Sequence, residues 1–474
     1  MKTRIILYGL PLLILLSAGQ KQEWISLFDG QTLDGWRASE NKDSWIVKDG
    51  AIVTNGPRSH LFYEGDVMNH DFRNFEFEAE VKTEPVSNSG IYFHTRFQEE
   101  GWPGKGYECQ IINSKPEGRT GENKMTGSIY AIRNCWKSPV PDREWFQYRI
   151  LVRGKTIQTF INGGLIAEYT EPEQPYRTES FKGRLLSSGT FALQCHDPGS
   201  RVSFRNIRVK PLPDDVPTPG TPPGDPEFEK QIIELAGSNI PLVDLHVHLK
   251  GGLSMETAME NAREYGFTYG FAVNCGKGMT VQTNGELKEY LDAYTRPPQT
   301  WHGMQAEGRE WLDTFSAEEI SRFDYIFTDA MTWTNDKGKR MRLWSPEETE
   351  VGDPQKFMDQ LVARIVDIVE NEPIDIYVNP TYLPDEINDR YDELWTGDRM
   401  DRVIAALAEK HVALEINNRR MIPSPAFIRR AKKAGVKFTF GTNNAGADDL
   451  GRMEYAIRMI RECKLEPGDI WLPD

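Results

Sequence analysis

The sequence predicts two domains, an all-β sandwich or jelly roll over residues 21–212 and a seven-stranded β/α barrel over residues 227–474. The chain has 474 residues, which is more than one ordinary domain holds. Its first part carries short apolar and polar alternations between turn residues, a pattern typical of antiparallel strands. Its second part alternates strand-like and helix-like stretches, which favours parallel pairing in a barrel. Residues 213–226, rich in Pro and Gly, are predicted to be an extended linker between the two.

Residues 1–20 are predicted to be a secretory signal peptide. Lys2 and Arg4 give a positive start, residues 5–16 form an apolar run, and residues 17–19 are small enough for cleavage. The apolar run is too short to span a bilayer comfortably. We therefore expect a periplasmic or secreted protein without an integral membrane segment after cleavage.

Charge and cysteine content narrow the class of protein. The formal net charge of -15 and the pI of about 5.2 argue against a nucleic-acid or anionic-membrane partner and suit a small, neutral or polar ligand. The five Cys residues include no Cys-x-x-Cys pair, so buried free thiols are expected. One disulfide among Cys109, Cys135 and Cys195 is the alternative.

The individual elements follow from hydropathy period and turn residues. In the first domain we expect strands at residues 44–47, 75–81, 90–96, 107–112, 128–132, 146–153, 156–161, 189–194 and 202–209. In the second domain we expect strands at residues 242–248, 269–274, 301–307, 325–333, 375–380, 413–417 and 437–442. The clearest helices are expected at residues 354–370, 399–411, 425–434 and 452–463.

The strand over residues 106–112 is the most informative stretch of the first domain. Side chains alternate between the two faces of a strand, so Glu108 and Gln110 share one face while Cys109 lies on the other. A carboxylate and an amide side by side on an otherwise apolar strand need solvent, a partner or a ligand. The alternatives are an exposed sheet face and a binding site.

Ordered motifs run through the whole first domain: Leu-Phe-Asp-Gly-Gln-Thr-Leu-Asp-Gly-Trp at 27–36, Asn-Ser-Gly-Ile-Tyr-Phe at 88–93, Gly-Tyr-Glu-Cys-Gln-Ile at 106–111, Gly-Ser-Ile-Tyr at 127–130, Glu-Trp at 144–145, Asn-Gly at 162–163, Leu-Gln-Cys-His at 193–196 and Phe-Arg-Asn-Ile at 204–207. With these motifs the domain resembles the 3-keto-disaccharide hydrolase domain family. The resemblance implies a concanavalin-A-like jelly roll that binds sugars on its concave face and cleaves 3-keto-glycosides.

The chemistry of that family implies roles for particular residues. A ketone at C3 acidifies the C2 proton, so a base can remove this proton while an acid protonates the leaving oxygen at C1; water then adds back. Glu108 is the predicted base, and His196 the predicted acid or enolate donor. The alternative is that both are structural, satisfied by neighbouring groups. Four further residues are predicted to bind the substrate: Gln110, Tyr130, His94 and Arg96. His94 stands where the family often has Arg.

The barrel begins with a His-x-His strand. His246 and His248 share one face at the carboxyl end of the strand, where barrel sites form. With seven strands this resembles the polymerase-and-histidinol-phosphatase (PHP) phosphoesterases, which hold two or three divalent metals. Most of the other ligand positions hold different residues here: Cys275-Gly276, Gln305, Asp329 and Met331, Asn379-Pro380, and Gly-Thr-Asn-Asn-Ala at 441–445.

Neutral amides are poor ligands for several divalent cations, so we expect an eroded metal site. His246 and His248, with Glu307 or alternatively Glu415, are candidates for holding one divalent ion such as Zn²⁺. The alternative is that both histidines are held by hydrogen bonds alone.

These observations predict an exported carbohydrate-active hydrolase that cleaves 3-keto-glycosides by acid/base elimination and hydration in the β domain. The substrate is expected to be a small carbohydrate or glycoside. The first alternative is a non-catalytic carbohydrate-binding module attached to a metal-dependent hydrolase-like barrel. The second places catalysis in the barrel itself.

Overall fold

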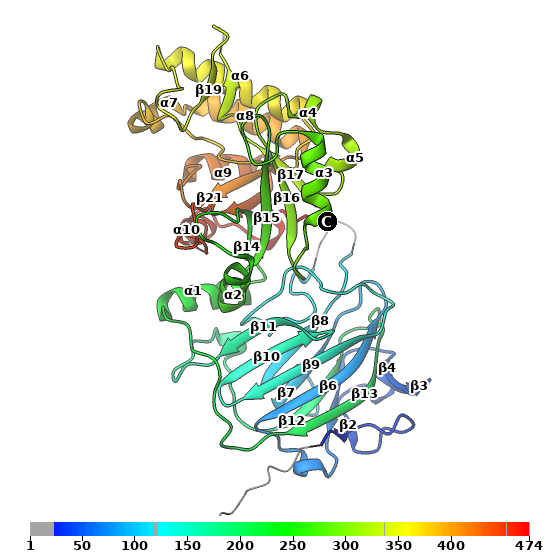
Figure 1. The fold of residues 1–474 in the computed structure, drawn as a ribbon. Helices are drawn as coiled ribbons and strands as arrows, with labels where there is room; N and C mark the ends of the chain where they lie inside the picture. Colours follow the sequence, from blue (N-terminus) through cyan, green and yellow to red (C-terminus); the bar gives the residue numbers. More distant parts are fainter. Residues whose placement is uncertain (1–22, 117–120, 336, 452, 474) are drawn as a thin grey trace, which may run out of the picture.

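The computed structural model describes residues 23–116, 121–335, 337–451 and 453–473, and it contains two domains (Figure 1). The predicted signal peptide, residues 1–20, lies outside the described residues. An antiparallel β-sandwich forms the N-terminal domain, and a nearly closed parallel barrel with surrounding helices forms the C-terminal domain. The predicted fold class is confirmed for both.

The sandwich has two sheets, which we call the back sheet and the front sheet. Within the described residues, the back sheet has the strand order β11-β10-β9-β6-β13-β4-β3, with β1 paired to β13. Its strands are β1 (Ile25–Ser26), β3 (Trp45–Lys48), β4 (Ala51–Thr54), β6 (Phe75–Thr83), β9 (Phe146–Arg153), β10 (Thr156–Ile161), β11 (Gly164–Thr170) and β13 (Val202–Pro211). The front sheet consists of β2 (Trp36–Ala38), β5 (Ser59–Tyr63), β12 (Thr190–Cys195), β7 (Ser89–Thr95) and β8 (Tyr107–Ile111), in that order. Short 3₁₀ helices are η1 (Lys42–Ser44), η2 (Val67–His70) and η3 (Glu179–Phe181).

One predicted strand of the sandwich is wrong. Residues 128–132 form a tight turn with isolated bridges, in which the amides of Ile129 and Arg133 each donate to the other's carbonyl at 2.9 Å. The positive φ angles of Gly127 and Ala131, 95° and 65°, are incompatible with an extended strand. Conversely, β1, β2, β4, β5 and β11 were not predicted. All five residues of β5 are buried, so its sequence lacks the alternation that identifies a half-exposed strand.

The barrel sheet has the order β14-β15-β16-β17-β20-β21-β22 among the described residues, and every pair in it is parallel. Its strands are β14 (Val243–Val247), β15 (Thr268–Cys275), β16 (Trp301–Ala306), β17 (Tyr325–Thr328), β20 (Ile376–Tyr377), β21 (Ala413–Asn417) and β22 (Phe438–Gly441). The two end strands approach each other, and the Asn443 amide donates to the His246 carbonyl at 3.0 Å. The predicted strand 325–333 is shorter than expected. The Asp329 carboxylate accepts from the Met331 amide at 2.8 Å and turns the chain into a separate hairpin, β18 (Thr332–Thr334) and β19 (Arg340–Arg342).

Helices surround the barrel: α1 (Pro226–Gly237), α2 (Met255–Tyr265), α3 (Asn284–Ala293), α4 (Trp311–Thr314), α5 (Ala317–Ile320), α6 (Pro354–Asn371), α7 (Tyr391–Leu394), α8 (Gly397–Lys410), α9 (Pro425–Lys433) and α10 (Glu454–Glu462), with 3₁₀ helices η4 (Asn388–Arg390) and η5 (Pro467–Asp469). Three of the longer helices have an N-cap side chain that accepts a hydrogen bond from a backbone amide of the first turn: Asp353 caps α6, Thr396 caps α8 and Ser424 caps α9. The helices predicted at residues 354–370, 399–411 and 425–434 are therefore confirmed to within two residues at each end.

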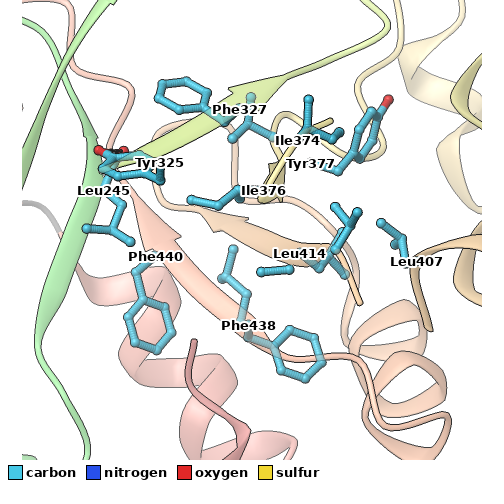
Figure 2. Close-up of a cluster of buried hydrophobic side chains, with 14 of the residues drawn as sticks. Leu245, Tyr325, Phe327, Ile374, Ile376, Tyr377, Leu407, Leu414, Phe438 and Phe440 are labelled. Carbon is cyan, nitrogen blue, oxygen red and sulfur yellow. Dashed lines mark hydrogen bonds between the residues drawn. The ribbon is translucent and has the colours of Figure 1, made fainter. Parts of the chain in front are cut away.

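The barrel core is built from apolar side chains of its neighbouring strands (Figure 2). Leu245 of β14 lies beside Tyr325 of β17, and the same cluster includes Phe327 of β17, Ile376 and Tyr377 of β20, Leu414 of β21, and Phe438 and Phe440 of β22. The Tyr325 hydroxyl is buried but satisfied, because it donates to the Leu245 carbonyl at 2.7 Å. This apolar core fixes the strands whose carboxyl ends carry the polar residues described below.

The two domains meet through a buried polar interface, with α1 and α2 lying nearest the sandwich (Figure 1). Arg133 of the sandwich has a side chain that is only 1% exposed and lies 2.7 Å from the Glu229 carboxylate of α1. Its Nε also donates to the Glu264 carbonyl of α2 at 2.6 Å. The Trp136 indole donates to the Gly266 carbonyl at 3.0 Å. The domains are therefore joined by specific hydrogen bonds and by an ion pair removed from water.

Replacing Arg133 by Met should lower the free energy of unfolding by about 3–5 kcal/mol, because Glu229 would keep a buried charge without its partner. Urea denaturation followed by circular dichroism measures the effect. The double variant Arg133→Met/Glu229→Met is the control, and it should recover much of the loss because no unpaired charge remains. A single variant as stable as the wild type would contradict the assigned role of the pair.

All five Cys residues are buried free thiols, as predicted. Burial raises the pKa of the Cys135 thiol to about 12, and Cys275 is affected in the same way. In the part of the chain that the structure describes, no helix has the length and apolar character needed to cross a bilayer.

Candidate functional site

A cavity of about 410 Å³ opens on the face of the front sheet that is turned away from the back sheet. Glu108 and Gln110 of β8 project into it, while their neighbour Cys109 belongs to the apolar core between the sheets. The predicted division of this strand into a polar and an apolar face is therefore correct. The other lining residues are Asn88, Tyr92, Trp102, Pro103, Gly104, Gly106, Glu122, Tyr130, Ser180, Phe181, Gly183, Arg184, Gln194 and His196.

Glu108 lies at the centre of a buried polar cluster. Its Oε2 accepts from an Arg184 guanidinium nitrogen at 2.7 Å, and its Oε1 accepts from Gln194 Nε2 at 2.9 Å. The Glu108 and Arg184 side chains are 6% and 8% exposed. A Cβ at Gly90 on the adjacent strand β7 would lie 2.9 Å from Glu108 Oε1, so only Gly leaves room for the carboxylate. The strands β12, β7 and β8 thus hold the carboxylate in one place.

Three polar atoms of this cluster have no hydrogen-bond partner among the described residues. They are Arg184 Nη1, Gln110 Oε1 and Gln194 Oε1, and all three are buried. All three side chains line the cavity. Because a buried polar atom without a partner costs about 1–3 kcal/mol, these atoms are suited to a ligand that supplies one acceptor and two donors.

Arg184 is surrounded by aromatic rings as well as by its carboxylate partner. Its guanidinium lies 5.4 Å from the Tyr92 ring centre, 5.5 Å from Tyr130 and 5.6 Å from Phe181. Burial alone would lower the pKa of Arg184, but Glu108 and Tyr92 outweigh it and raise this pKa. The group is therefore a fixed positive charge at the cavity wall.

His196 follows β12 directly and lines the same cavity. Its Nδ1 lies 2.8 Å from Asp197 Oδ2, and its ring lies 5.0 Å from that of Trp102. Burial would raise the pKa of Asp197, but hydrogen bonds from His196, Ser200 and the Gly199 amide outweigh it and lower this pKa. An ionised Asp197 accepts a hydrogen bond from His196 Nδ1 and so fixes the orientation of the ring. Nε2 is then the ring nitrogen that can exchange a proton with a ligand.

Tyr130 and Glu122 form the wall of the cavity nearest the barrel. The Tyr130 hydroxyl donates to Glu122 Oε2 at 2.7 Å, and Lys124 Nζ donates to Glu122 Oε1 at 2.9 Å. Burial would raise the pKa of Glu122, but Lys124 and the Tyr130 hydroxyl outweigh it and lower this pKa. The lowered pKa favours the ionised form, so Glu122 gives the cavity a second negatively charged carboxylate in addition to Glu108.

Two predicted binding residues lie away from this cavity. Both ring nitrogens of His94 are engaged by the backbone, with the Arg73 carbonyl at 2.8 Å and the Ser187 amide at 3.2 Å. Its pKa is lowered to about 4, mainly by burial. Arg96 is exposed beyond the end of β7 and does not line the cavity. Glu108, His196, Gln110 and Tyr130 are brought together, whereas His94 and Arg96 are not among the lining residues.

Arg184, Gln194 and Glu122 are cavity residues that the sequence analysis did not single out. Arg184 lies 76 positions from Glu108, in a segment without helix or strand that follows η3. Gln194 belongs to the Leu-Gln-Cys-His motif at 193–196, so its position beside His196 was a usable signal. No local pattern marks Arg184 or Glu122.

The predicted barrel site is a connected hydrogen-bond network. His246 Nδ1 lies 2.6 Å from Glu415 Oε1, and His246 Nε2 lies 3.3 Å from Gln305 Oε1. Gln305 in turn donates to Glu307 Oε1 at 3.0 Å. At the other side, Asn379 donates to Asp329 Oδ2 at 2.8 Å. The residues at the expected metal-ligand positions therefore form hydrogen bonds with one another.

This arrangement does not fit the predicted metal site. Across the described ranges, no group of three or more His, Cys, Asp or Glu side chains is arranged to hold a metal ion. Both nitrogens of His246 are engaged, and the Glu307 carboxylate is bound by Gln305 and by Thr332, at 3.3 Å from the Thr332 hydroxyl. Burial, followed by the nearby Asp329 carboxylate, raises the pKa of Glu307. His246, His248 and Glu307 thus do not form a common donor set.

The sandwich matches a known family. Residues 23–210 match the model of the 3-keto-alpha-glucoside-1,2-lyase-like domain. A curated relative, the 3-keto-disaccharide hydrolase of Bacteroides thetaiotaomicron, is 28% identical over 230 residues, covering 40% of this chain and 78% of that protein. The resemblance predicted for this domain is therefore confirmed.

Solved structures resemble each half of the chain. The crystal structure of a candidate glycosyl hydrolase from Parabacteroides distasonis is 24% identical in sequence, with a TM-score of 0.35. The match covers 40% of this chain and 94% of that chain. The crystal structure of a histidinol phosphate phosphatase from Lactococcus lactis is 14% identical in sequence, with a TM-score of 0.33. The match covers 48% of this chain and 95% of that chain.

Proposed function

We propose that this protein is a carbohydrate hydrolase that cleaves 3-keto-glycosides, with its chemistry in the cavity of the N-terminal domain. The observation that carries the proposal is the arrangement of three unpartnered polar atoms around the Glu108 carboxylate. They provide one donor on a fixed cation and two amide acceptors, which matches a sugar carrying a carbonyl and hydroxyl groups. The family match of residues 23–210 supports the same substrate class.

The first step requires a base and a place for negative charge. Glu108 removes the C2 proton of the 3-keto sugar, and the electrons of the C2–H bond pass toward the C3 oxygen. Arg184 Nη1, which has no partner among the described residues, donates to this oxygen and stabilises the enolate. Gln110 and Gln194 accept hydrogen bonds from sugar hydroxyl groups through their unpartnered oxygens.

The second step releases the leaving group. As the enolate electrons re-form the ketone, a C1–C2 double bond forms and the C1–oxygen bond breaks. The protonated His196 ring donates its Nε2 proton to the departing oxygen, and Asp197 holds the ring through Nδ1. Water then adds across the double bond, with its hydroxyl at C1 and a proton at C2, so the net reaction is hydrolysis.

Isotope incorporation separates this route from direct displacement by a carboxylate pair. In D₂O, wild-type protein given a 3-keto-glucoside should release the aglycone and produce a 3-keto sugar with deuterium at C2. Mass spectrometry and NMR of the product measure the label, and the parent glucoside, which lacks the ketone, should not be cleaved. Turnover without deuterium at C2 would exclude the elimination route. Sugar binding without any turnover would favour the alternative, a carbohydrate-binding module.

We further propose that the protein acts in the periplasm or outside the cell. The proposal rests on the positive start and apolar run of residues 1–20, which are typical of a signal peptide. The neutral, polar substrate class agrees with the net charge of -15. Fractionation of cells that express the full chain tests the location.

A further inference from the structure

Asn239 lies in the connection between α1 and β14 of the C-terminal domain, and its side chain reaches into the N-terminal domain. Its Oδ1 accepts from the Asn123 amide at 2.8 Å and from Lys124 Nζ at 3.3 Å. Its Nδ2 donates to the Gly121 carbonyl at 3.0 Å. The Asn239 carbonyl accepts from Asn123 Nδ2 at 3.0 Å. Four hydrogen bonds thus join one barrel residue to the segment 121–124.

That segment carries the second carboxylate of the cavity. The Asn123 amide, which donates to Asn239, also donates to Glu122 Oε1 at 2.9 Å. Lys124 Nζ bridges the same two side chains, Glu122 and Asn239. The Lys124 side chain is only 1% exposed, so its buried charge needs the Glu122 carboxylate and the Asn239 side-chain oxygen as partners. The position of the Glu122 carboxylate therefore depends on the barrel.

The conformation of Asn239 suits this task. Its φ angle is 65°, in the left-handed region that Asn tolerates better than most residues. The end of α1 also lies close to a second lining residue, because a Cβ at Gly237 would lie 3.5 Å from the Phe181 ring. Farther up α1, Glu234 accepts from the Tyr176 hydroxyl at 3.0 Å. The end of α1 and the turn after it thus contact two separate segments that contribute lining residues, Glu122 and Phe181, to the cavity.

We infer that Asn239 is a positioning residue for the sugar reaction: it acts through Glu122, so the barrel domain holds part of the catalytic cavity in shape. The inference rests on the proposed function. Glu122 in turn accepts from the Tyr130 hydroxyl, and the Tyr130 ring packs 5.5 Å from the Arg184 guanidinium. A shift of the segment 121–124 is therefore transmitted to the group that stabilises the enolate.

Turnover of a 3-keto-glucoside by full-length variants tests the functional part. Asn239→Ala should lower kcat/KM by about 10- to 100-fold, since small misplacements in a site are costly. Asn239→Asp keeps both acceptor contacts and should recover part of the activity. In the Glu122→Gln background, Asn239→Ala should have little further effect, because residues that act as a unit are not additive. Fully additive losses would overturn the inference.

Hydrogen–deuterium exchange gives a second readout that needs no activity. In Asn239→Ala, peptides covering residues 121–130 should exchange faster, because the Asn123 amide loses an acceptor. Lys137→Met is the matched control: it removes another interdomain hydrogen bond, from Lys137 Nζ to the Thr300 carbonyl at 3.0 Å, away from the cavity. It should leave both exchange in this segment and activity unchanged.

The two readouts separate the possible failures. Unchanged exchange in Asn239→Ala would overturn the positioning role whatever the activity. Faster exchange with wild-type turnover would show that the segment 121–124 is held but does not affect the reaction, which also overturns it. A wild-type protein without turnover of any 3-keto-glycoside would instead overturn the proposed function, and the catalytic part of this inference with it.

Discussion

Glu108→Gln should abolish most of the turnover of a 3-keto-glucoside, with kcat lower by about 10²–10⁴-fold, the usual contribution of a general base. The amide keeps the size of the side chain, and its oxygen can still accept from Arg184, so the cavity should keep its shape. It cannot remove the C2 proton. Product release under saturating substrate measures kcat, and the deuterium label at C2 should disappear together with activity.

The paired histidines of the barrel provide the matched control for this prediction. His246→Ala/His248→Ala removes the center of the barrel network and should leave the sugar reaction largely intact, with folding checked by circular dichroism. Loss of turnover in this folded double variant, with Glu108→Gln still active, would move the chemistry to the barrel. Such an outcome would contradict the assignment of the cavity.

Much of the fold follows from local pattern. The face on which Glu108 and Gln110 lie was predicted correctly, because strand side chains alternate regardless of the tertiary environment. The barrel was predicted from strand–helix alternation, which requires parallel pairing. Errors occurred where local geometry overrides hydropathy, as at Ala131, whose φ of 65° turns an apolar stretch into a tight turn.

The site could be predicted only in part, because its contacts join distant positions. Arg184 pairs with a carboxylate 76 positions away, and Gln194 with the same carboxylate 86 positions away. In the barrel, His246 meets Glu415 across 169 positions. Residue types identified the histidines as metal candidates, but only the folded arrangement reveals that hydrogen bonds occupy both nitrogens of His246 and the Nδ1 of His248. Asn239 carries no local signal at all, since its role arises where two domains meet.

Arg184→Met should have an effect comparable to the loss of the base. It removes the cation that pairs with Glu108 and the Nη1 donor assigned to the enolate. Loss of one donor to a developing oxyanion lowers kcat by about 10²–10³-fold. Because the donor matters most in the transition state, kcat should fall more than KM rises. Steady-state kinetics with a 3-keto-glucoside measure both constants.

Arg184→Lys separates the two roles of this side chain. A Lys ammonium restores a positive charge beside Glu108, but it cannot present the planar fork that serves the carboxylate and a second acceptor together. We therefore expect Arg184→Lys to recover the stability lost in Arg184→Met, as judged by urea denaturation, without recovering kcat. If Lys restored turnover fully, charge alone would explain the effect, and the assignment of Nη1 to the C3 oxygen would be wrong. If Arg184→Met raised KM alone, the guanidinium would serve binding, since uniform binding energy changes KM without changing kcat.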